Sequence, residues 1–199
     1  PYPGIEPESV SLLVTSPPYL NNYDYADRTR LEMFFFGWAS SWRDITEKVR
    51  KRLLMACTTQ VRRSDFDEEN PVRPEIWEAD RKLALEILNK VKALSKIRRE
   101  KGGRKSYDLM VAGYFNDMFD VLRQIYRVMK KGAKSVWVLG DSAPYGVYIP
   151  TEEYLGRMAQ AIGFRGFVVH VLRRRGEKWA HNPQRHKVPL KESILTIFK

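Results

Sequence analysis

Cysteine, histidine and long apolar runs are scarce in this chain of 199 residues, and each scarcity excludes a class of protein. A single cysteine, Cys57, excludes an internal disulfide framework and a multi-cysteine zinc site, and it indicates a reducing compartment. With three histidines, no metal centre is predicted. No apolar run reaches the roughly 18 residues that a membrane span needs, and Pro1-Tyr2-Pro3-Gly4 lacks the pattern of a secretory signal. We therefore expect a soluble cytoplasmic protein with no membrane partner.

Acidic residues are in the minority, which points to a class of partner. The chain carries 35 Lys and Arg against 24 Asp and Glu, so its formal net charge is +11 and its pI is about 9.8. A surface of this charge attracts polyanions, among which nucleic acid is the leading candidate. Hydrophobic residues make up 43% of the chain, which is a globular rather than a disordered composition.

Apolar periodicity predicts alternating strands and helices. The run from Val10 to Thr15 is typical of a buried strand, and the prolines that follow end it because they lack amide donors. The segment over 31–55 is predicted to form one or two helices packed on the sheet. Helices are also predicted over 74–99, 114–129 and 151–162, a loop over 64–74, a basic turn over 130–134, and strands over 135–139, 166–172 and 192–198. The order predicts one α/β region over 1–199, with an open, mostly parallel sheet, a final antiparallel strand pair and helices on both faces.

The segment Thr15-Ser16-Pro17-Pro18-Tyr19 carries the most specific signal, because it follows a strand where open α/β sheets place their ligands. It resembles the catalytic motif of the amino-group DNA methyltransferases, in which Ser, Asp or Asn precedes Pro-Pro and an aromatic residue. The resemblance implies a Rossmann-like methyltransferase sheet, S-adenosylmethionine as cofactor and double-stranded DNA as substrate. The alternative is that the segment is a Pro-Pro turn that ends a strand and has no catalytic role.

The chemistry of amine methylation suits these residue types. An aromatic amine is a poor nucleophile because its lone pair is delocalised, so an enzyme must hold it with acceptors that favour a tetrahedral nitrogen. Ser16 Oγ and the Pro17 carbonyl are such acceptors, and Pro17 and Pro18 fix the backbone that aims them. Tyr19 would stack on a base flipped out of the duplex. Ser16, Pro17, Pro18 and Tyr19 are therefore the predicted catalytic residues.

The chain also departs from the family. Family members hold the cofactor with an aromatic-x-Gly-x-Gly turn, and no two glycines here are separated by a single residue. We therefore interpret the chain as the catalytic half only, with the cofactor half on a second chain or a missing segment, unless the activity has been lost. Thr15, Asp141 and Ser142 are the remaining candidates for cofactor contacts, because each lies at the end of a predicted strand.

Three polar or basic regions are candidates for DNA binding. The continuation after Tyr19 resembles one branch of the family, and a helical basic insertion over about 57–110 ends in a dense basic run. A second basic set begins at Arg173, in the long connection over 173–190. The predicted contacts are Asn21, Asn22, Arg28, Arg30, Lys96, Arg98, Arg99, Lys101, Arg173, Arg174 and Arg175. The alternative reading of each charge run is a solvated surface, and Cys57 is interpreted as an inert buried thiol.

The resemblance implies a DNA methyltransferase of a restriction-modification system. Ser at the first motif position is commoner among enzymes that methylate cytosine N4, and Asp among those that methylate adenine N6, so Ser16 favours cytosine. Two alternatives stay open. One is a non-catalytic DNA-binding module or methyltransferase remnant that lacks the cofactor half. The other is methylation of RNA or of a protein glutamine.

Overall fold

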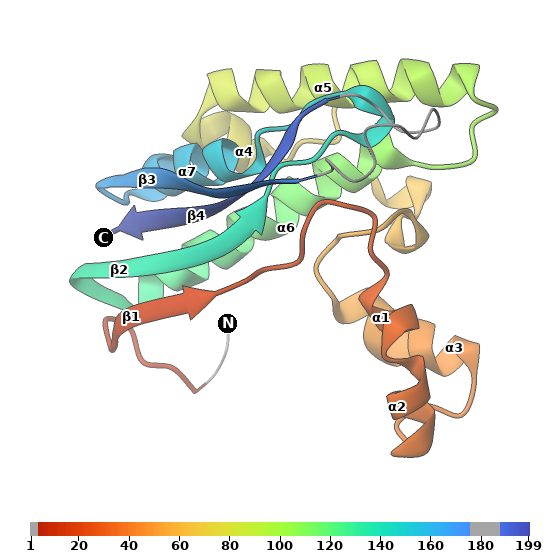
Figure 1. Cartoon of the computed structure of the whole chain (residues 1–199), viewed down its shortest axis with the longest axis horizontal. Helices are drawn as coiled ribbons and strands as arrows, with labels where there is room; N and C mark the ends of the chain where they lie inside the picture. The colour runs from red at the N-terminus through yellow and green to blue at the C-terminus, as the bar shows by residue number, and fades with distance from the viewer. Residues whose placement is uncertain (1–3, 176–187) are drawn as a thin grey trace.

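The computed structural model describes residues 4–175 and 188–199 of the chain, which form a sheet, a helical layer and a projecting group of short helices (Figure 1). In chain order the elements are β1 (Val10–Thr15), α1 (Tyr25–Arg28), α2 (Arg30–Phe35), α3 (Trp42–Asp44), η1 (Ile45–Val49), η2 (Arg50–Arg52), η3 (Thr58–Gln60), η4 (Arg63–Asp65), α4 (Pro74–Ala79), α5 (Arg81–Glu100), α6 (Tyr107–Val128), β2 (Met129–Gly140), η5 (Pro144–Gly146), α7 (Thr151–Ile162), β3 (Gly166–Arg175) and β4 (Leu190–Phe198). None of the described helices is long and apolar enough to cross a membrane.

The described strands form one sheet in the order β1-β2-β4-β3. β1 runs parallel to β2, and β4 lies between β2 and β3 and pairs antiparallel with both. The prediction of a final antiparallel strand pair is confirmed. The prediction of a mostly parallel sheet is correct for strand direction, since β1, β2 and β3 run the same way. It is wrong for strand pairing, since only β1 and β2 pair in parallel. The reason is that β4 inserts between two strands that would otherwise pair in parallel.

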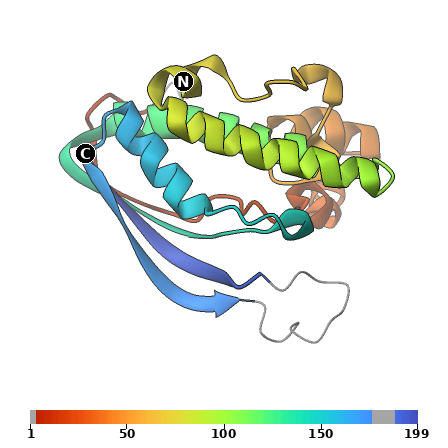
Figure 2. The same cartoon turned by 90° about the horizontal axis from the view of Figure 1, so that it is seen from above.

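Helices cover one face of this sheet, and the prediction of helices on both faces is wrong for the described residues. Figure 2 shows α5, α6 and α7 together on one side of the strands. On that side Trp137 of β2 and Leu195 of β4 are paired and almost fully buried. The connection from β1 to β2 and the connection from β2 to β3 both cross the sheet in the same direction. Because crossover connections between parallel strands have the same handedness, their helices lie on the same face of the sheet.

The opposite face of the sheet is apolar and open among the described residues. Side chains alternate between faces along a strand, so the neighbours of the buried residues point to this side. Val14 of β1 is 70% exposed, and Val168 of β3 is 57% exposed. In register with them lie Val136 of β2 and Thr196 of β4. We call this surface the open sheet face.

Most predicted helices and strands are confirmed, with shifted ends. The helix predicted over 74–99 is two helices, α4 and α5, because Asp80 ends the first and caps the second by accepting a hydrogen bond from the Leu83 N–H at 2.9 Å. The helix predicted from residue 114 begins at Tyr107. β2 begins at Met129, the last residue of the helix predicted over 114–129, and it continues through the predicted basic turn, where Gly132 has a φ of +78°.

The segment predicted as one or two helices over 31–55 is broken into short turns. α2 ends at Phe35, Gly37 follows at a φ of +70°, and α3 holds three residues before a π-helical turn. The prediction that these helices pack on the sheet is wrong, because they project beyond it and bury a small separate cluster of Ala26, Met33, Ala39 and Ile45. We call residues 25–52 the helical lobe.

Candidate active site

The Ser16–Tyr19 turn lies where the parallel pair β1 and β2 ends. Pro17 is buried, Ser16 is exposed, and the Ser16 hydroxyl donates a hydrogen bond to the Val138 carbonyl of β2 at 3.0 Å. A hydroxyl has one proton and two lone pairs, so donation to Val138 leaves the lone pairs of Oγ directed away from the sheet. The turn therefore presents a fixed oxygen acceptor to solvent at the end of the sheet.

Tyr19 is held by a carboxylate that the sequence did not single out. Its hydroxyl donates to Glu192 Oε1 at 2.8 Å, and Glu192 Oε2 accepts from Arg173 Nε at 2.6 Å. Glu192 lies at the start of β4, opposite Gly140 on one side and Arg173 on the other. The hydrogen bond and charge of Glu192 raise the pKa of the exposed Arg173. The register of Glu192 with Arg173 on the neighbouring strand could have identified this residue. That register can be recognised only when the pairing of β3 and β4 is known.

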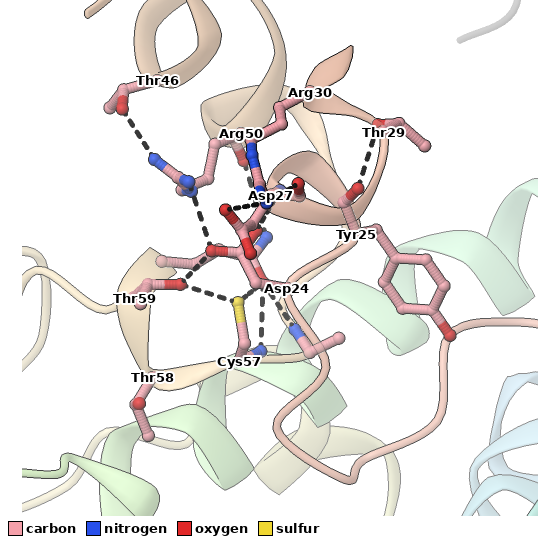
Figure 3. Close-up of polar contacts among 12 residues, drawn as sticks. Asp24, Tyr25, Asp27, Thr29, Arg30, Thr46, Arg50, Cys57, Thr58 and Thr59 are labelled. Atoms are coloured by element: carbon pink, nitrogen blue, oxygen red, sulfur yellow. Dashed lines mark hydrogen bonds and ion pairs between the residues drawn. The ribbon is translucent and has the colours of Figure 1, made fainter. Parts of the chain in front are cut away.

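The loop after the motif is tied to the helical lobe through Asp24, Arg50 and Thr59, which we call the Asp24 cluster (Figure 3). Asp24 Oδ2 accepts from Thr59 Oγ1 at 2.7 Å and lies 3.2 Å from the Arg50 guanidinium, while Oδ1 accepts from the Asp27 N–H. Partial burial raises the pKa of Asp24, but the hydrogen bonds from Thr59 and Asp27 and the charge of Arg50 together bring it below its ordinary value. Asp24 is therefore a charged anchor at neutral pH.

Cys57 and Asn22 flank this cluster. Cys57 is buried, and its Sγ lies 3.0 Å from Thr59 Oγ1; burial raises the pKa of the thiol, which supports the interpretation as an inert residue. Asn22, a predicted DNA contact, accepts from the Thr58 N–H at 2.8 Å and donates to the Tyr107 hydroxyl at 3.3 Å. Asn22 thus fixes the loop, whereas Asn21 beside it is exposed.

The two arginines predicted in α1 and α2 make local contacts. Arg28 is exposed, with its guanidinium 5.3 Å from the centre of the Tyr23 ring. Arg30 lies 3.1 Å from the Asp27 carboxylate and 5.9 Å from the centre of the Trp42 ring. The helices that carry them, α1 and α2, project beyond the sheet (Figure 1).

The basic run at the end of α5 divides into exposed and structural residues. Lys96, Arg99 and Lys101 are exposed. Arg98 instead points inward, where its Nε lies 3.1 Å from the almost fully buried carboxylate of Asp108 and its Nη1 donates to the Gly103 carbonyl. Its side chain joins α5 to α6, so its charge is already neutralised within the fold.

The remaining predicted residues lie along the sheet ends. Thr15 is half-buried and pairs with Trp137 in register, and Arg174 is exposed on β3. The side chain of Arg175 lies outside the described residues. So do the further members of the second basic set, which are Lys178, Arg185, His186 and Lys187, with Trp179 and His181 between them. Across the described part of the chain, no three His, Cys, Asp or Glu side chains are grouped so that they could hold a metal ion.

A pocket of about 700 Å³ brings predicted residues of two kinds together. Its lining includes Asn21, Asn22 and Lys101, which were predicted to bind DNA, and Asp141 and Ser142, which were predicted to contact the cofactor. The Asp141 carboxylate accepts from the Tyr148 hydroxyl at 3.0 Å and from the Lys191 N–H at 2.8 Å, and it contributes to a raised pKa of Tyr148 after the larger effect of burial. Asp141 therefore supports the pocket wall.

Comparison with known proteins identifies relatives of the whole chain. It is 27% identical over 209 aligned residues to Type II methyltransferase M.BsoBI of Geobacillus stearothermophilus, with 99% of the chain covered. It is 28% identical over 171 residues to Type II methyltransferase M.AvaI of Nostoc sp. and of Anabaena variabilis, with 81% covered. This chain is similar to type II methyltransferases.

The similarity supports the broader part of the resemblance, to DNA methyltransferases, and it covers more of the chain than the motif does. Because the match to M.BsoBI covers 99% of the chain, it includes the insertion predicted over about 57–110. The chain spans 40% of the length of M.BsoBI and 32% of the length of M.AvaI. No protein-family model and no solved structure matches the chain.

Proposed function

We propose that this chain is the catalytic half of a DNA methyltransferase that acts on an exocyclic amine, with cytosine N4 favoured over adenine N6. The observation that carries the proposal is the Ser16–Tyr19 turn at the end of the parallel strand pair, with an exposed Ser16 oxygen held by Val138. Similarity to type II methyltransferases supports the reaction class. The positive net charge of +11 supports DNA as the substrate.

In this proposal the chain orients the amine and the base. Ser16 Oγ and the Pro17 carbonyl accept the two amine hydrogens, which turns the nitrogen lone pair toward the methyl donor. The Tyr19 ring stacks on the flipped base, and Glu192 limits the rotation of that ring through its hydroxyl. S-adenosylmethionine supplies the methyl group when it is bound.

The described residues fit the amine better than they fit the cofactor. S-adenosylmethionine carries a sulfonium and an ammonium group, and the pocket beside the motif is bordered by two lysines, Lys101 and Lys105. Asp141, the one acid of that lining, already accepts two hydrogen bonds. We therefore place the principal cofactor site on another segment of the enzyme and derive no step of the reaction through the bound cofactor.

The open sheet face gives that other segment a place to pack. Its exposed side chains include Leu12 at 52% and Val14 at 70% on β1 and Val168 at 57% on β3. Apolar surface of this extent marks an interaction site in a folded protein. Relatives more than twice as long as this chain supply a candidate occupant, namely the cofactor half of the same enzyme. We propose that amphipathic helices of that half cover the face.

Nucleoside mass spectrometry of DNA methylated by the complete enzyme tests the proposal. We expect N4-methylcytosine, and N6-methyladenine as the sole product would contradict the cytosine assignment.

Ser16→Ala should lower the rate of methyl transfer by roughly ten- to a thousandfold with DNA affinity nearly unchanged, because the hydrogen bond from the amine to Ser16 acts in the transition state. Ser11→Ala, at an exposed serine of β1, is the matched control. DNA binding without any methyl transfer would favour the non-catalytic module.

A further inference from the structure

The pocket beside the catalytic turn is formed by three parts of the chain that are distant in sequence. Asn21 and Asn22 contribute from the loop after Tyr19, Ser142 from the loop after β2, and Lys101 and Lys105 from the junction of α5 and α6. Its volume of about 700 Å³ lies within the range of about 300 to 1,000 Å³ that is typical of small-molecule sites. The pocket therefore has room for one nucleotide.

The charge of the lining favours an anion. Lys101 and Lys105 are exposed at the border of the pocket, on either side of the Gly102-Gly103 turn. The Asp141 carboxylate accepts from the Tyr148 hydroxyl and the Lys191 N–H, and its single negative charge stands against the two ammonium groups in the lining. A phosphate group gains attraction from both ammonium groups, whereas the sulfonium of S-adenosylmethionine is repelled by them.

Aromatic rings form a second wall. Tyr107 and Tyr145 meet edge to face with their ring centres 4.8 Å apart, and Lys101 Nζ lies 5.7 Å from the centre of the Tyr145 ring. Asn22 fixes the Tyr107 hydroxyl through its amide. Tyr145 has a φ of 50°, a left-handed conformation that costs energy for a side-chain-bearing residue and that is commonest at functional sites. The rings offer a surface on which a nucleobase can stack.

One polar atom of the lining has no partner. Ser142 is 5% exposed, and its Oγ is buried without a hydrogen-bond partner among the described residues. A buried hydroxyl without a partner costs free energy that a ligand can recover by bonding to it. A nucleobase edge, which carries both donors and acceptors, can supply that bond once the Ser142 side chain rotates toward the pocket, because its oxygen is closed to solvent in the structure.

We propose that this pocket binds one nucleotide of the DNA substrate, with its phosphate at Lys101 and Lys105, its base against Tyr107 and Tyr145, and a hydrogen bond to Ser142. The inference rests on the proposed function for the identity of the polymer, but the nucleotide class follows from the lining itself. It also reassigns Ser142 from cofactor contact to nucleotide contact, and it gives Lys101 a defined place in DNA binding.

A titration of the complete 199-residue chain with deoxycytidine 5′-monophosphate and with deoxycytidine tests the site. We would follow the amide resonances of Ala143 and Gly146, which line the pocket, by NMR. The monophosphate should bind about tenfold or more tightly than the nucleoside, because two cations face its phosphate. The double variant Lys101→Gln/Lys105→Gln should remove that ratio, and Tyr145→Ala should weaken both ligands by a similar factor.

The variant Lys82→Gln/Lys92→Gln is the matched control, since it removes the same charge from exposed lysines of α5 that do not line the pocket. An equal loss in this control would overturn the proposal, because the effect would then come from the general field of the protein. Equal affinity for the two ligands would also overturn it. Displacement of the monophosphate by S-adenosylmethionine would assign the pocket to the cofactor instead. A complete enzyme that methylates DNA while its pocket binds no nucleotide would refute this site and leave the proposed function intact.

Discussion

The sheet with its helical layer and the helical lobe are held together in different ways. Beneath α5, α6 and α7 the sheet buries Trp137, Leu195 and Ile197 almost completely, and these belong to one continuous cluster. The lobe buries four small or medium side chains and leaves large ones in solvent, such as Phe35 at 85% and Trp38 at 66% exposed. Since apolar burial stabilises in proportion to area, the lobe depends more on its polar contacts.

The first prediction concerns the core of the sheet, and it has the largest expected effect. Trp137→Ala should lower the free energy of unfolding by about 3 to 5 kcal/mol, because it opens a cavity in a core that cannot collapse around it. Val14→Ala, on the open sheet face, should change it by about 0.5 kcal/mol or less in this chain. Denaturant unfolding measures both values. A comparable loss for Val14→Ala would show that the open sheet face is already covered, for example by self-association.

The second prediction concerns the polar contacts that stabilise the helical lobe. Asp24→Ala removes the acceptor for Thr59 and the Asp27 N–H and leaves Arg50 without its carboxylate, so it should destabilise the lobe by about 1 to 3 kcal/mol. Hydrogen exchange should report faster opening of residues 25–52 while α6 keeps its protection. Asp27→Ala, which leaves the Asp24 carboxylate in place, is the control. Uniform loss of protection across the chain would contradict a lobe that opens independently.

The third prediction uses pH to weaken the same contact reversibly. The folded pKa of Asp24 is lowered below 3.8, so the stabilisation by the cluster is fully present above that pH and is lost as pH falls through the folded pKa. The amide proton of Asp27, which donates to Asp24, should therefore titrate with a midpoint below pH 3.8. Asp24→Asn should abolish that transition. A midpoint above 3.8 would mean that burial outweighs the hydrogen bonds and the Arg50 charge.

The same contrast explains how much of the fold was predictable from the sequence. β1 and α7 were predicted with their observed limits, because each has a clear apolar period and a Pro or Gly at its end. The lobe was predicted incorrectly, because Phe34, Trp38 and Trp42 recur at helical spacing although no sheet lies behind them. Periodicity shows that side chains share a face, and it does not show what covers that face. The placement of β4 between β2 and β3 also required tertiary information, since strand order leaves no local signal.

At the candidate site, the residues that are adjacent in sequence could be predicted, and the residues that only the fold brings together could not. Ser16 to Tyr19 form one motif, and its position at a strand end is confirmed. Glu192 and Tyr145 lie more than a hundred residues from Tyr19 and reach this region only through strand pairing and the loop after β2. Arg98 shows the converse. In sequence it is one of several similar cations, and only its buried partner Asp108 distinguishes it from Lys96 and Arg99.

The final prediction concerns the exposed aromatic residues of the lobe and expects the smallest effect. Phe35→Ser and Trp38→Ser should each change the free energy of unfolding by about 0.5 kcal/mol or less, because both side chains are mostly exposed and their ring contacts are with Phe36, which is itself exposed. Met33→Ala, in the same helix as Phe35 but 7% exposed, should destabilise the lobe measurably. Thermal unfolding together with hydrogen exchange over residues 25–52 distinguishes these outcomes. If Phe35→Ser destabilised the lobe as much as Met33→Ala, the aromatic side chains would be packed in solution, and the lobe would owe its stability to burial in the same way as the sheet.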